Sequence, residues 1–295
     1  MNTANYRYSL GGDEHLFVEI SDSMSLHAFF KSMMTTSALK KQNIPGVIEI
    51  CPANASFQVR FDPDVLPVEQ LIDTLKSIEK SLENAQDMSL QTRIIEIPVL
   101  YNDPWTHETL MRFRERHQDP QSTDIEYAAR INGYGDIDEF IKAHSDTPWF
   151  VSMVGFVAGL PFMFQMVEQQ KQIQVPKYLS PRTDTPKLTV GHGGCFGCIY
   201  SVRGAGGYQM FGVTPIPIFD PTQTVAHLSE FMILFNPGDI VKFNPVNKDE
   251  YDQLVNDVEN NRFKLRTHPV EFSLNKFLAQ PQNYPKQLME ALYVN

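Results

Sequence analysis

Residues 147–167 have the sequence TPWFVSMVGFVAGLPFMFQMV, in which no side chain is charged. A stretch of this polarity and length is about long enough to cross a bilayer as one helix. Pro148, Gly155, Gly159 and Pro161, however, divide it into pieces of strand length. The stretch therefore predicts two buried strands joined by a glycine-rich bend rather than a transmembrane helix.

The segments on the C-terminal side of this stretch extend the β pattern. From residue 149 to 245 helical periodicity is absent, and glycine, proline and short β-branched runs dominate, which is typical of an all-β barrel with long loops. Beyond residue 245, Tyr251, Leu254 and Val258 recur at helical spacing. We expect a helix there, followed at 274–294 by a tail that packs on the body of the protein or on a partner.

On the N-terminal side, three helix starts can be recognised from their caps. Asp103 precedes a proline, Thr123 stands three residues before a glutamate, and Asp136 precedes an apolar face that ends near His144. Each is a recognised start signal, because the cap side chain accepts a hydrogen bond from a backbone N–H of the first turn. These residues predict a helical connection ahead of the barrel.

The first hundred residues alternate between strand and helix patterns. Two amphipathic helices are predicted from apolar faces that begin at Leu26 and Val68. The order of elements, β-α-β-β-α-β, is that of the ferredoxin-like arrangement, with two helices on one face of an antiparallel sheet. The first strand is expected at 7–10 and 16–20, interrupted by a turn at 11–13, and the other three at 47–50, 57–61 and 93–100.

Length and composition indicate a globular α+β protein. The chain has 295 residues, of which 42% are hydrophobic and 20% charged, and a chain of this length commonly forms more than one domain. We expect a ferredoxin-like domain at 1–98, a helical connection with a β-barrel at 99–245 and a helical extension at 246–295.

Charge and terminal composition bear on location and partners. The formal net charge is −10, and an acidic surface discourages non-specific binding to nucleic acid. Residues 1–10 are polar and do not have the pattern of a secretory signal. We expect a cytoplasmic protein that binds neither nucleic acid nor a membrane.

The three cysteines, Cys51, Cys195 and Cys198, are too few for a disulfide scaffold and fit a reducing compartment. Cys195 and Cys198 form a C-x-x-C pair, which can bind a metal or act in redox chemistry. His192 alone does not complete a zinc site, and the pair does not open a helix. The alternative is that both are small side chains in a tight strand, and we expect no metal in this chain.

Two glycine clusters occupy residues 191–194 and 204–208. Neither lies between a strand and a helix, so neither is a nucleotide-binding fingerprint. Glycines at this density serve barrel corners, where φ is positive or backbones approach closely. The alternative is a set of N–H groups that hold an oxygen whose negative charge grows during a reaction.

A proline-stiffened loop at 175–187 carries Lys177, Arg182 and Lys187. Such a loop in an acidic protein either binds a carboxylate, bicarbonate or phosphate or is an ordinary solvated loop. His144, at the end of a predicted helix, is either a cation that stabilises the helix C-terminus or a general base.

Several segments, taken in order, form a recognisable set of motifs. They are FVSMVGFVAGLPFM at 150–163, SPRTDTPK at 180–187, GAGGY at 204–208, FGVTP at 211–215, FDP at 219–221 and FNPGDIVKF at 235–243. This set resembles the family that contains allophanate hydrolase subunit 1 and the corresponding 5-oxoprolinase subunit, the carboxyltransferase domains of subdomain C and D type. The segments 124–133, 190–200, 206–209 and 269–272 are similar to the carboxyltransferase region of urea carboxylase.

The resemblance implies a fold, and the sequence departs from the family's motifs at four positions. The implied fold is a small ferredoxin-like N-terminal domain with a cyclophilin-like β-barrel. Where the family has proline, tryptophan and two arginines, this chain has Ala205, Tyr208, Lys187 and Val213. Because lysine does not reproduce the bidentate fork of arginine, these departures bear on which anionic group is recognised.

The resemblance also implies a function, that of a carboxyltransferase subunit in a biotin-dependent carboxylase acting on urea or a small amide-like substrate. Partners would be a homologous second carboxyltransferase subunit, a biotin carboxylase that uses ATP and a carrier that brings carboxybiotin. The resemblance implies catalytic roles for Lys177 and Arg182, which would hold the carboxylate, and for His144, either as a proton carrier or as a positioning group. It also implies substrate contacts at Tyr200, Gly206, Gly207, Tyr208 and Gln209, with the oxyanion at the glycine turn.

Two other functions stay open within the same resemblance. One is a subunit of a 5-oxoprolinase-type lactamase, in which ATP drives the opening of a cyclic amide and the partner binds a lactam. The other is a non-catalytic regulator similar to a sporulation-kinase inhibitor, which would bind a histidine kinase without needing the residues at 177–209.

Overall fold

The computed structural model describes residues 6–83 and 88–293. They form two compact units. The first contains the described residues up to Gln91 together with Glu271–Ala279, and the second contains Thr92–Val270 together with the described residues from Gln280 onward.

The expected domain boundaries differ from this division in detail. Residue 98 falls inside a strand, Ser89–Tyr101, and the three-segment division stays a prediction. Part of the polar N-terminus and the last residue of the expected tail, 1–5 and 294, lie outside the described residues.

The first unit contains a four-stranded antiparallel sheet in the order β1-β2-β4-β3. Its strands and helices are β1 (Arg7–Leu10), β2 (His15–Glu19), α1 (Leu26–Gln42), β3 (Val47–Ala53), β4 (Ser56–Phe61), α2 (Val68–Glu83) and α7 (Leu274–Ala279). Ser25 caps α1 by accepting a hydrogen bond from the N–H of Ala28. Leu71 and Leu75 bury the predicted apolar face of α2. Both predicted helices are confirmed, and so are the strand segments predicted at 7–10, 16–20, 47–50 and 57–61. The first two segments are separate strands that pair with each other rather than one interrupted strand.

The strand expected at 93–100 does not close this sheet. The outer place beside β2 is taken by β1, whereas β5 (Ser89–Tyr101) pairs in the larger sheet of the molecule. Ile94, Ile95 and Ile97 are all fully buried, and a continuous apolar run of this kind suits a strand covered on both faces. The assignment of 93–100 to the first sheet is therefore wrong, and the ferredoxin-like arrangement stays a prediction.

The second unit is built on an eight-stranded mixed sheet in the order β12-β9-β10-β7-β6-β13-β5-β14. Because β12 also pairs with β5, the order closes on itself as an all-β barrel requires. Its strands besides β5 are β6 (Trp149–Val154), β7 (Pro161–Gln165), β9 (Thr189–Gly193), β10 (Phe196–Ile199), β12 (Gln209–Val213), β13 (Ile240–Pro245) and β14 (Thr267–Ser273). A separate pair joins β8 (Arg182–Thr185) to β11 (Gly204–Gly206). The cyclophilin-like assignment of the barrel stays a prediction.

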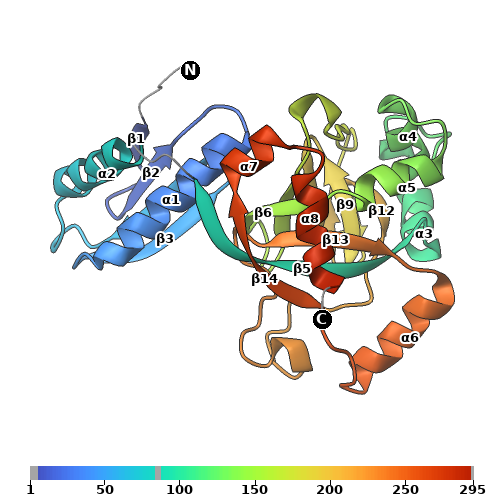
Figure 1. Ribbon diagram of the computed structural model, residues 1–295. Coiled ribbons are helices and arrows are strands. Elements are labelled where there is room, and N and C mark those ends of the chain that lie inside the picture. The colour runs from blue at the N-terminus through green and yellow to red at the C-terminus, as the bar shows by residue number, and fades with distance from the viewer. Residues whose placement is uncertain (1–5, 84–87, 294–295) are drawn as a thin grey trace. The chain divides into compact units, whose positions relative to one another are not determined.

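The helices of the second unit begin where their caps predicted. Asp103 accepts hydrogen bonds from Trp105 and Thr106 at the start of α3, Thr123 forms a capping box at α4, and the side chain of Asp136 caps α5. The helices are α3 (Pro104–Phe113), α4 (Asp124–Ile131), α5 (Ile137–Ser145), α6 (Lys248–Glu259) and α8 (Tyr284–Glu290), with short 3-10 turns at Arg114–Arg116, Gln169–Lys171, Ala226–Leu228 and Ala291–Tyr293. Figure 1 shows α3, α4 and α5 grouped beside β12.

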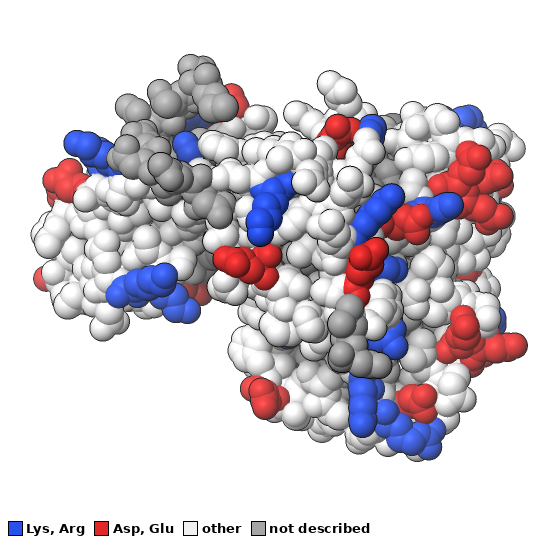
Figure 2. Space-filling model, in the orientation of Figure 1, with Lys and Arg blue, Asp and Glu red and all other residues white. Residues whose placement is uncertain are grey.

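The uncharged stretch at 147–167 forms β6 and β7, which pair antiparallel within the barrel. Trp149, Phe150, Val151 and Met163 are fully buried there, which explains the absence of charge. None of the helices that the structure describes combines the length and the apolar character needed to span a bilayer. On the face shown in Figure 2, acidic and basic side chains are interspersed.

Candidate functional site

A cavity of about 340 Å³ lies in the second unit, where the β6–β7 loop, the proline loop and the glycine turn meet. Its lining combines an apolar wall with one ammonium group, two phenols and exposed backbone. The lining residues are Phe156, Leu160, Phe162, Lys177, Pro181, Cys198, Tyr200, Ala205, Gly206, Gly207 and Tyr208. We call it the site cavity.

The proline loop and the glycine turn, which the sequence places far apart, are neighbours at this cavity. The N–H of Tyr178 donates to the carbonyl of Gly207 over 2.8 Å. A Cβ placed on Gly207 would lie 4.0 Å from the Cβ of Lys177. The ammonium of Lys177 lies 5.2 Å from the ring centroid of Tyr208, a cation–π distance. The predicted cationic loop and glycine turn thus face one cavity.

The glycines of the turn are needed for close packing rather than for positive φ. Gly206 and Gly207 do not have a positive φ. A Cβ on Gly206 would overlap the ring of Tyr200, and one on Gly193 would overlap the ring of Tyr208. Among the described residues, the N–H of Gly207 donates to no backbone or side-chain acceptor. The turn, which lines the cavity, therefore contains one unused donor.

The two phenols of the cavity are held together and stay protonated. The N–H of Tyr208 donates to the hydroxyl oxygen of Tyr200 over 3.3 Å. Burial raises the pKa of each phenol well above the usual value for tyrosine. At neutral pH both hydroxyls are hydrogen-bond donors, and neither can act as a base.

Arg182 lies behind the cavity and does not line it. Its side chain is fully buried, its Nε donates to the hydroxyl of Thr185 over 3.2 Å, and its guanidinium stacks 4.4 Å from the ring centroid of Tyr178. Neither terminal nitrogen has a hydrogen-bond partner among the described residues. Its positive charge opposes the rise in pKa that burial causes at Tyr200 and Cys198.

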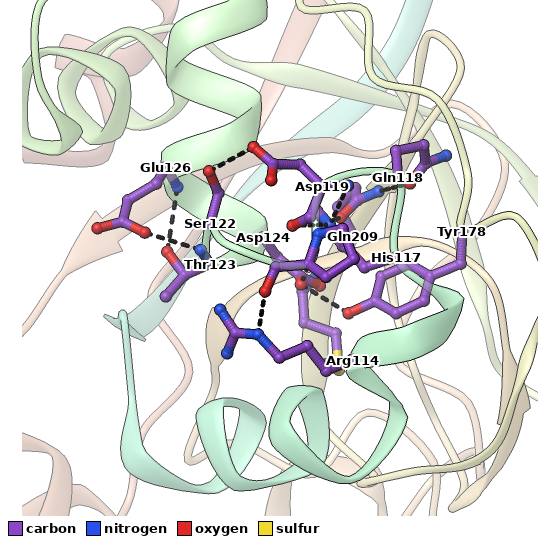
Figure 3. Close-up of polar contacts among 12 residues, drawn as sticks. Arg114, His117, Gln118, Asp119, Ser122, Thr123, Asp124, Glu126, Tyr178 and Gln209 are labelled. Atoms are coloured by element: carbon purple, nitrogen blue, oxygen red, sulfur yellow. Dashed lines mark hydrogen bonds and ion pairs between the residues drawn. The ribbon is translucent and has the colours of Figure 1, made fainter.

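A buried polar network supports the proline loop from the side of the helical connection (Figure 3). Asp124 accepts hydrogen bonds from the hydroxyl of Tyr178 and the N–H of Met210, each over 2.6 Å. Burial raises the pKa of Asp124, while the Tyr178 hydrogen bond and the charge of Arg182 oppose that rise. Asp124 and the buried Arg182 are thus connected by Tyr178, whose hydroxyl donates to the carboxylate and whose ring stacks against the guanidinium.

Gln209, expected to contact substrate, belongs to this network and not to the cavity lining. Its Oε1 lies 2.7 Å from Nε2 of His117, and its Nε2 donates to Gln118 and to the carbonyl of Pro176. Because Pro176 precedes Lys177, the side chain of Gln209 fixes the backbone that carries the cavity's ammonium group.

His144, the third expected catalytic residue, lies in the barrel core and does not line the cavity. Its Nδ1 lies 2.8 Å from the hydroxyl of Tyr101, and its ring packs against Trp149 and Phe243. Burial lowers its pKa well below the usual value. An imidazole in this position is a neutral core residue, separated from the group of residues around Lys177.

Sequence reasoning missed two groups of residues here. Phe156 and Phe162 lie in the motif at 150–163 but were given no role at the site, although an apolar aromatic residue directly after Gly155 in the glycine-rich bend was a usable signal for Phe156. His117 gave no signal and Asp124 appeared only as the first residue of the segment 124–133, because the network joins them to Tyr178 and Gln209 across long sequence separations.

The C-x-x-C pair does not form a metal site with its neighbours. In residues 6–83 and 88–293, no three His, Cys, Asp or Glu side chains are grouped as a metal site requires. Cys198 is buried in the cavity wall, and burial raises the pKa of its thiol far above the usual value. A thiol in that state is a small wall residue rather than a nucleophile.

The chain matches the family model of the carboxyltransferase domain, subdomain C and D, over residues 6–229. It is 26% identical over 275 residues to urea amidolyase of Lachancea kluyveri, which covers 92% of this chain and 15% of that protein. It is 27% identical over 258 residues to a 5-oxoprolinase subunit of Bacillus subtilis, which covers 84% of this chain and 96% of that protein. The chain thus spans a small part of the first relative and nearly all of the second.

Solved structures show the same fold. The K. lactis urea amidolyase superposes with a TM-score of 0.81 at 21% identity, covering 100% of this chain and 18% of that one. The Kluyveromyces lactis urea carboxylase superposes with a TM-score of 0.80 at 21% identity, covering 98% of this chain and 26% of that one.

Proposed function

Because the chain belongs to the family of carboxyltransferase domains, subdomain C and D, we propose that it is the carboxyltransferase subunit of a biotin-dependent carboxylase. Its substrate is urea or a small amide-like compound. The carboxyl group gained by the substrate nitrogen would leave a ureido nitrogen of biotin, which would take up the proton that the substrate nitrogen loses. The observation that carries this proposal is the meeting of Lys177, Gly207 and two protonated phenols at one cavity.

The cavity fits the ureido ring of biotin by size and by chemistry. A volume of about 340 Å³ lies within the range of roughly 300–1,000 Å³ that small-molecule sites have. Phe156, Leu160 and Phe162 offer an apolar wall to the faces of such a ring. The unused N–H of Gly207 suits the ring's oxygen.

Each residue of the cavity has a distinct role in this proposal. When bound, carboxybiotin supplies the activated carboxyl group. The N–H of Gly207 and the hydroxyl of Tyr200 hold the oxygen on which negative charge grows. Lys177 holds the carboxylate, while Tyr208 orients its ammonium group. The apolar wall excludes water and so strengthens these electrostatic contacts.

Arg182, Gln209 and His144 act differently from the cavity residues. Arg182 keeps the potential of the cavity positive from behind Tyr200, and Gln209 positions Lys177 through Pro176. His144, buried in the barrel core, moves no proton here.

The function requires other polypeptides. A biotin carboxylase would use ATP, a carrier would bring the biotin, and a homologous second carboxyltransferase subunit would complete the site. We propose that the chain is inactive without them and that the complex works in the cytoplasm.

A substitution at Lys177 tests this function in the assembled complex. Lys177→Ala removes the charge that holds the carboxylate, so urea-dependent carboxyl transfer should fall by about a hundredfold. The bicarbonate-dependent ATP hydrolysis of the biotin carboxylase should persist, because this step does not use the cavity. On the same preparation, labelled bicarbonate measures carboxyl transfer and released phosphate measures ATP hydrolysis.

Lys171→Ala is the matched control. Lys171 is exposed, pairs with Glu168 and lies outside the cavity lining, so its loss should leave transfer unchanged. Transfer at the wild-type rate in Lys177→Ala would remove Lys177 from the reaction.

A second candidate is the 5-oxoprolinase-type lactamase, favoured by the near-complete coverage of the Bacillus subtilis relative. In that function the Gly207 N–H and Lys177 would receive the amide oxygen of a lactam while ATP drives ring opening. ATP-dependent opening of 5-oxoproline by the complex in the absence of biotin would favour this candidate over the first.

A further inference from the structure

Phe156 combines an unfavourable backbone conformation with an exposed aromatic ring. Its φ is 73°, and its side chain is 76% exposed at the rim of the site cavity. Among the described residues other than glycine that have a positive φ, it is the only aromatic one. A left-handed φ strains a bulky residue, and such strain persists only where the surroundings impose it.

The surrounding loop is anchored firmly enough to impose this conformation. The N–H of Gly155 donates to the carbonyl of Leu160 over 3.0 Å, and the hydroxyl of Ser201 donates to the carbonyl of Ala158 over 2.5 Å. Val157 packs inward against the cluster of Leu160, Tyr200 and Tyr208. The turn therefore sends Val157 into the protein while Phe156 stays at the cavity rim.

The cavity offers a flat ligand complementary contacts on its faces and at its edge. Phe162 and Tyr208 provide aromatic surface in the wall. The N–H of Gly207 and the ammonium of Lys177 provide polar contacts. A ring with apolar faces and a carbonyl on its edge satisfies both kinds of contact at once.

We propose that Phe156 is a specificity-determining clamp that stacks on the face of a flat cyclic ureido or amide ring bound in the site cavity. This inference rests on the proposed function in taking the cavity as the substrate site. It goes further because it selects ring substrates and assigns the selection to one residue. Both candidate functions involve such a ring, in biotin or in a lactam.

The proposal predicts opposite effects on stability and on binding. Glycine adopts a positive φ without strain, so Phe156→Gly should raise the Tm by about 2 °C. The same variant should bind free biotin about three- to tenfold more weakly, because one stacked aromatic face is lost. A residue with a merely structural role would not weaken binding while raising stability.

Two further variants separate aromatic stacking from simple apolar cover. Phe156→Leu keeps apolar bulk without a flat face and should lose nearly as much affinity as Phe156→Gly. Phe156→Tyr keeps the face and should bind as the wild type does. Leu179→Ala is the control, since Leu179 is 75% exposed and lies outside the cavity lining.

The experiment titrates the full chain, assembled with its second carboxyltransferase subunit, calorimetrically with free biotin and, separately, with 5-oxoproline. The clamp is supported if Phe156→Gly and Phe156→Leu both bind at least one probe more weakly than the wild type. Phe156→Tyr and Leu179→Ala should bind that probe as the wild type does. The clamp is refuted if Phe156→Gly binds both probes with wild-type affinity. It is also refuted if neither probe binds the wild type. The proposed function fails separately, if the wild-type complex binds a probe yet transfers no carboxyl group.

Discussion

At the scale of single residues, His192 shows how the barrel interior selects one protonation state. Its Nε2 lies 3.1 Å from the carbonyls of both Ile173 and Gly194, so this nitrogen carries the proton and donates it. Burial lowers the pKa of His192 to about 4. The folded protein therefore holds this imidazole neutral at pH 7.

This lowered pKa makes stability depend on pH in a definite direction. Because the folded-state pKa lies below the ordinary value of 6.5, the stabilisation is present above pH 6.5 and is lost as the pH falls toward 4. Between pH 7 and pH 5 the free energy of unfolding should fall by about 2 kcal/mol through this residue. Urea denaturation at the two pH values measures it.

His192→Gln serves as the comparison, since glutamine keeps an N–H donor and does not titrate. The pH-dependent fall should be smaller in this variant by the contribution of His192. Burial, and to a smaller extent the charge of His192, lowers the pKa of His144, so the difference between the two proteins reports His192 together with its effect on His144. An identical fall in both proteins would contradict the assignment.

At the same scale, the sequence could indicate which residues gather at the cavity but not where each side chain points. Lys177, Tyr200, Gly206, Gly207 and Tyr208 line it, and the sequence singled out the proline loop, the segment 190–200 and the glycine turn that carry them. Arg182 and Gln209 come from the proline loop and the end of the glycine turn but do not line the cavity. Strand register decides that direction, and one sequence without its partner strands does not specify the register.

At the scale of elements, β11 shows how a strand made mostly of glycine admits a neighbouring ring. It pairs with β8 through a register irregularity between Gly204 and Gly206. The ring of Tyr200 occupies the space that a side chain at residue 206 would take, whereas nothing lies within 4 Å of a Cβ on Gly204. The two glycines of one strand thus have different tolerance to substitution.

A pair of alanine substitutions tests this difference. Gly206→Ala would push Tyr200 out of its place in the cavity wall, so the free energy of unfolding should fall by about 1–3 kcal/mol. Gly204→Ala should change it by less than about 0.5 kcal/mol. Denaturant titration measures both, and equal losses in the two variants would refute the packing role of Gly206.

Among the elements, the helices were more predictable than the sheet assignment. Asp103, Thr123 and Asp136 marked three helix starts because capping is local chemistry. The partner of β5 is non-local. A run such as Ile94–Ile97 indicates burial without saying in which sheet, and that is why the strand at 93–100 was misassigned.

At the scale of the whole molecule, the three functions still open differ in what the chain assembles with. The carboxyltransferase function predicts that a tagged chain purified from its own cells brings down a biotinylated protein and a homologous carboxyltransferase subunit. A streptavidin blot and mass spectrometry detect them, with a mock purification from untagged cells as the control. A lactam-binding partner without biotin would instead favour the oxoprolinase function, and a histidine kinase alone would contradict both enzymatic functions.

The first unit is completed by Glu271–Ala279, from almost the other end of the chain. The ring of Phe272 lies 5.1 Å from that of Phe30, between centroids, inside this unit. A polypeptide cut where the family match ends, at residue 229, would lack this aromatic contact. Anyone who grafts the N-terminal unit onto another protein must therefore transplant two separate pieces of the gene together.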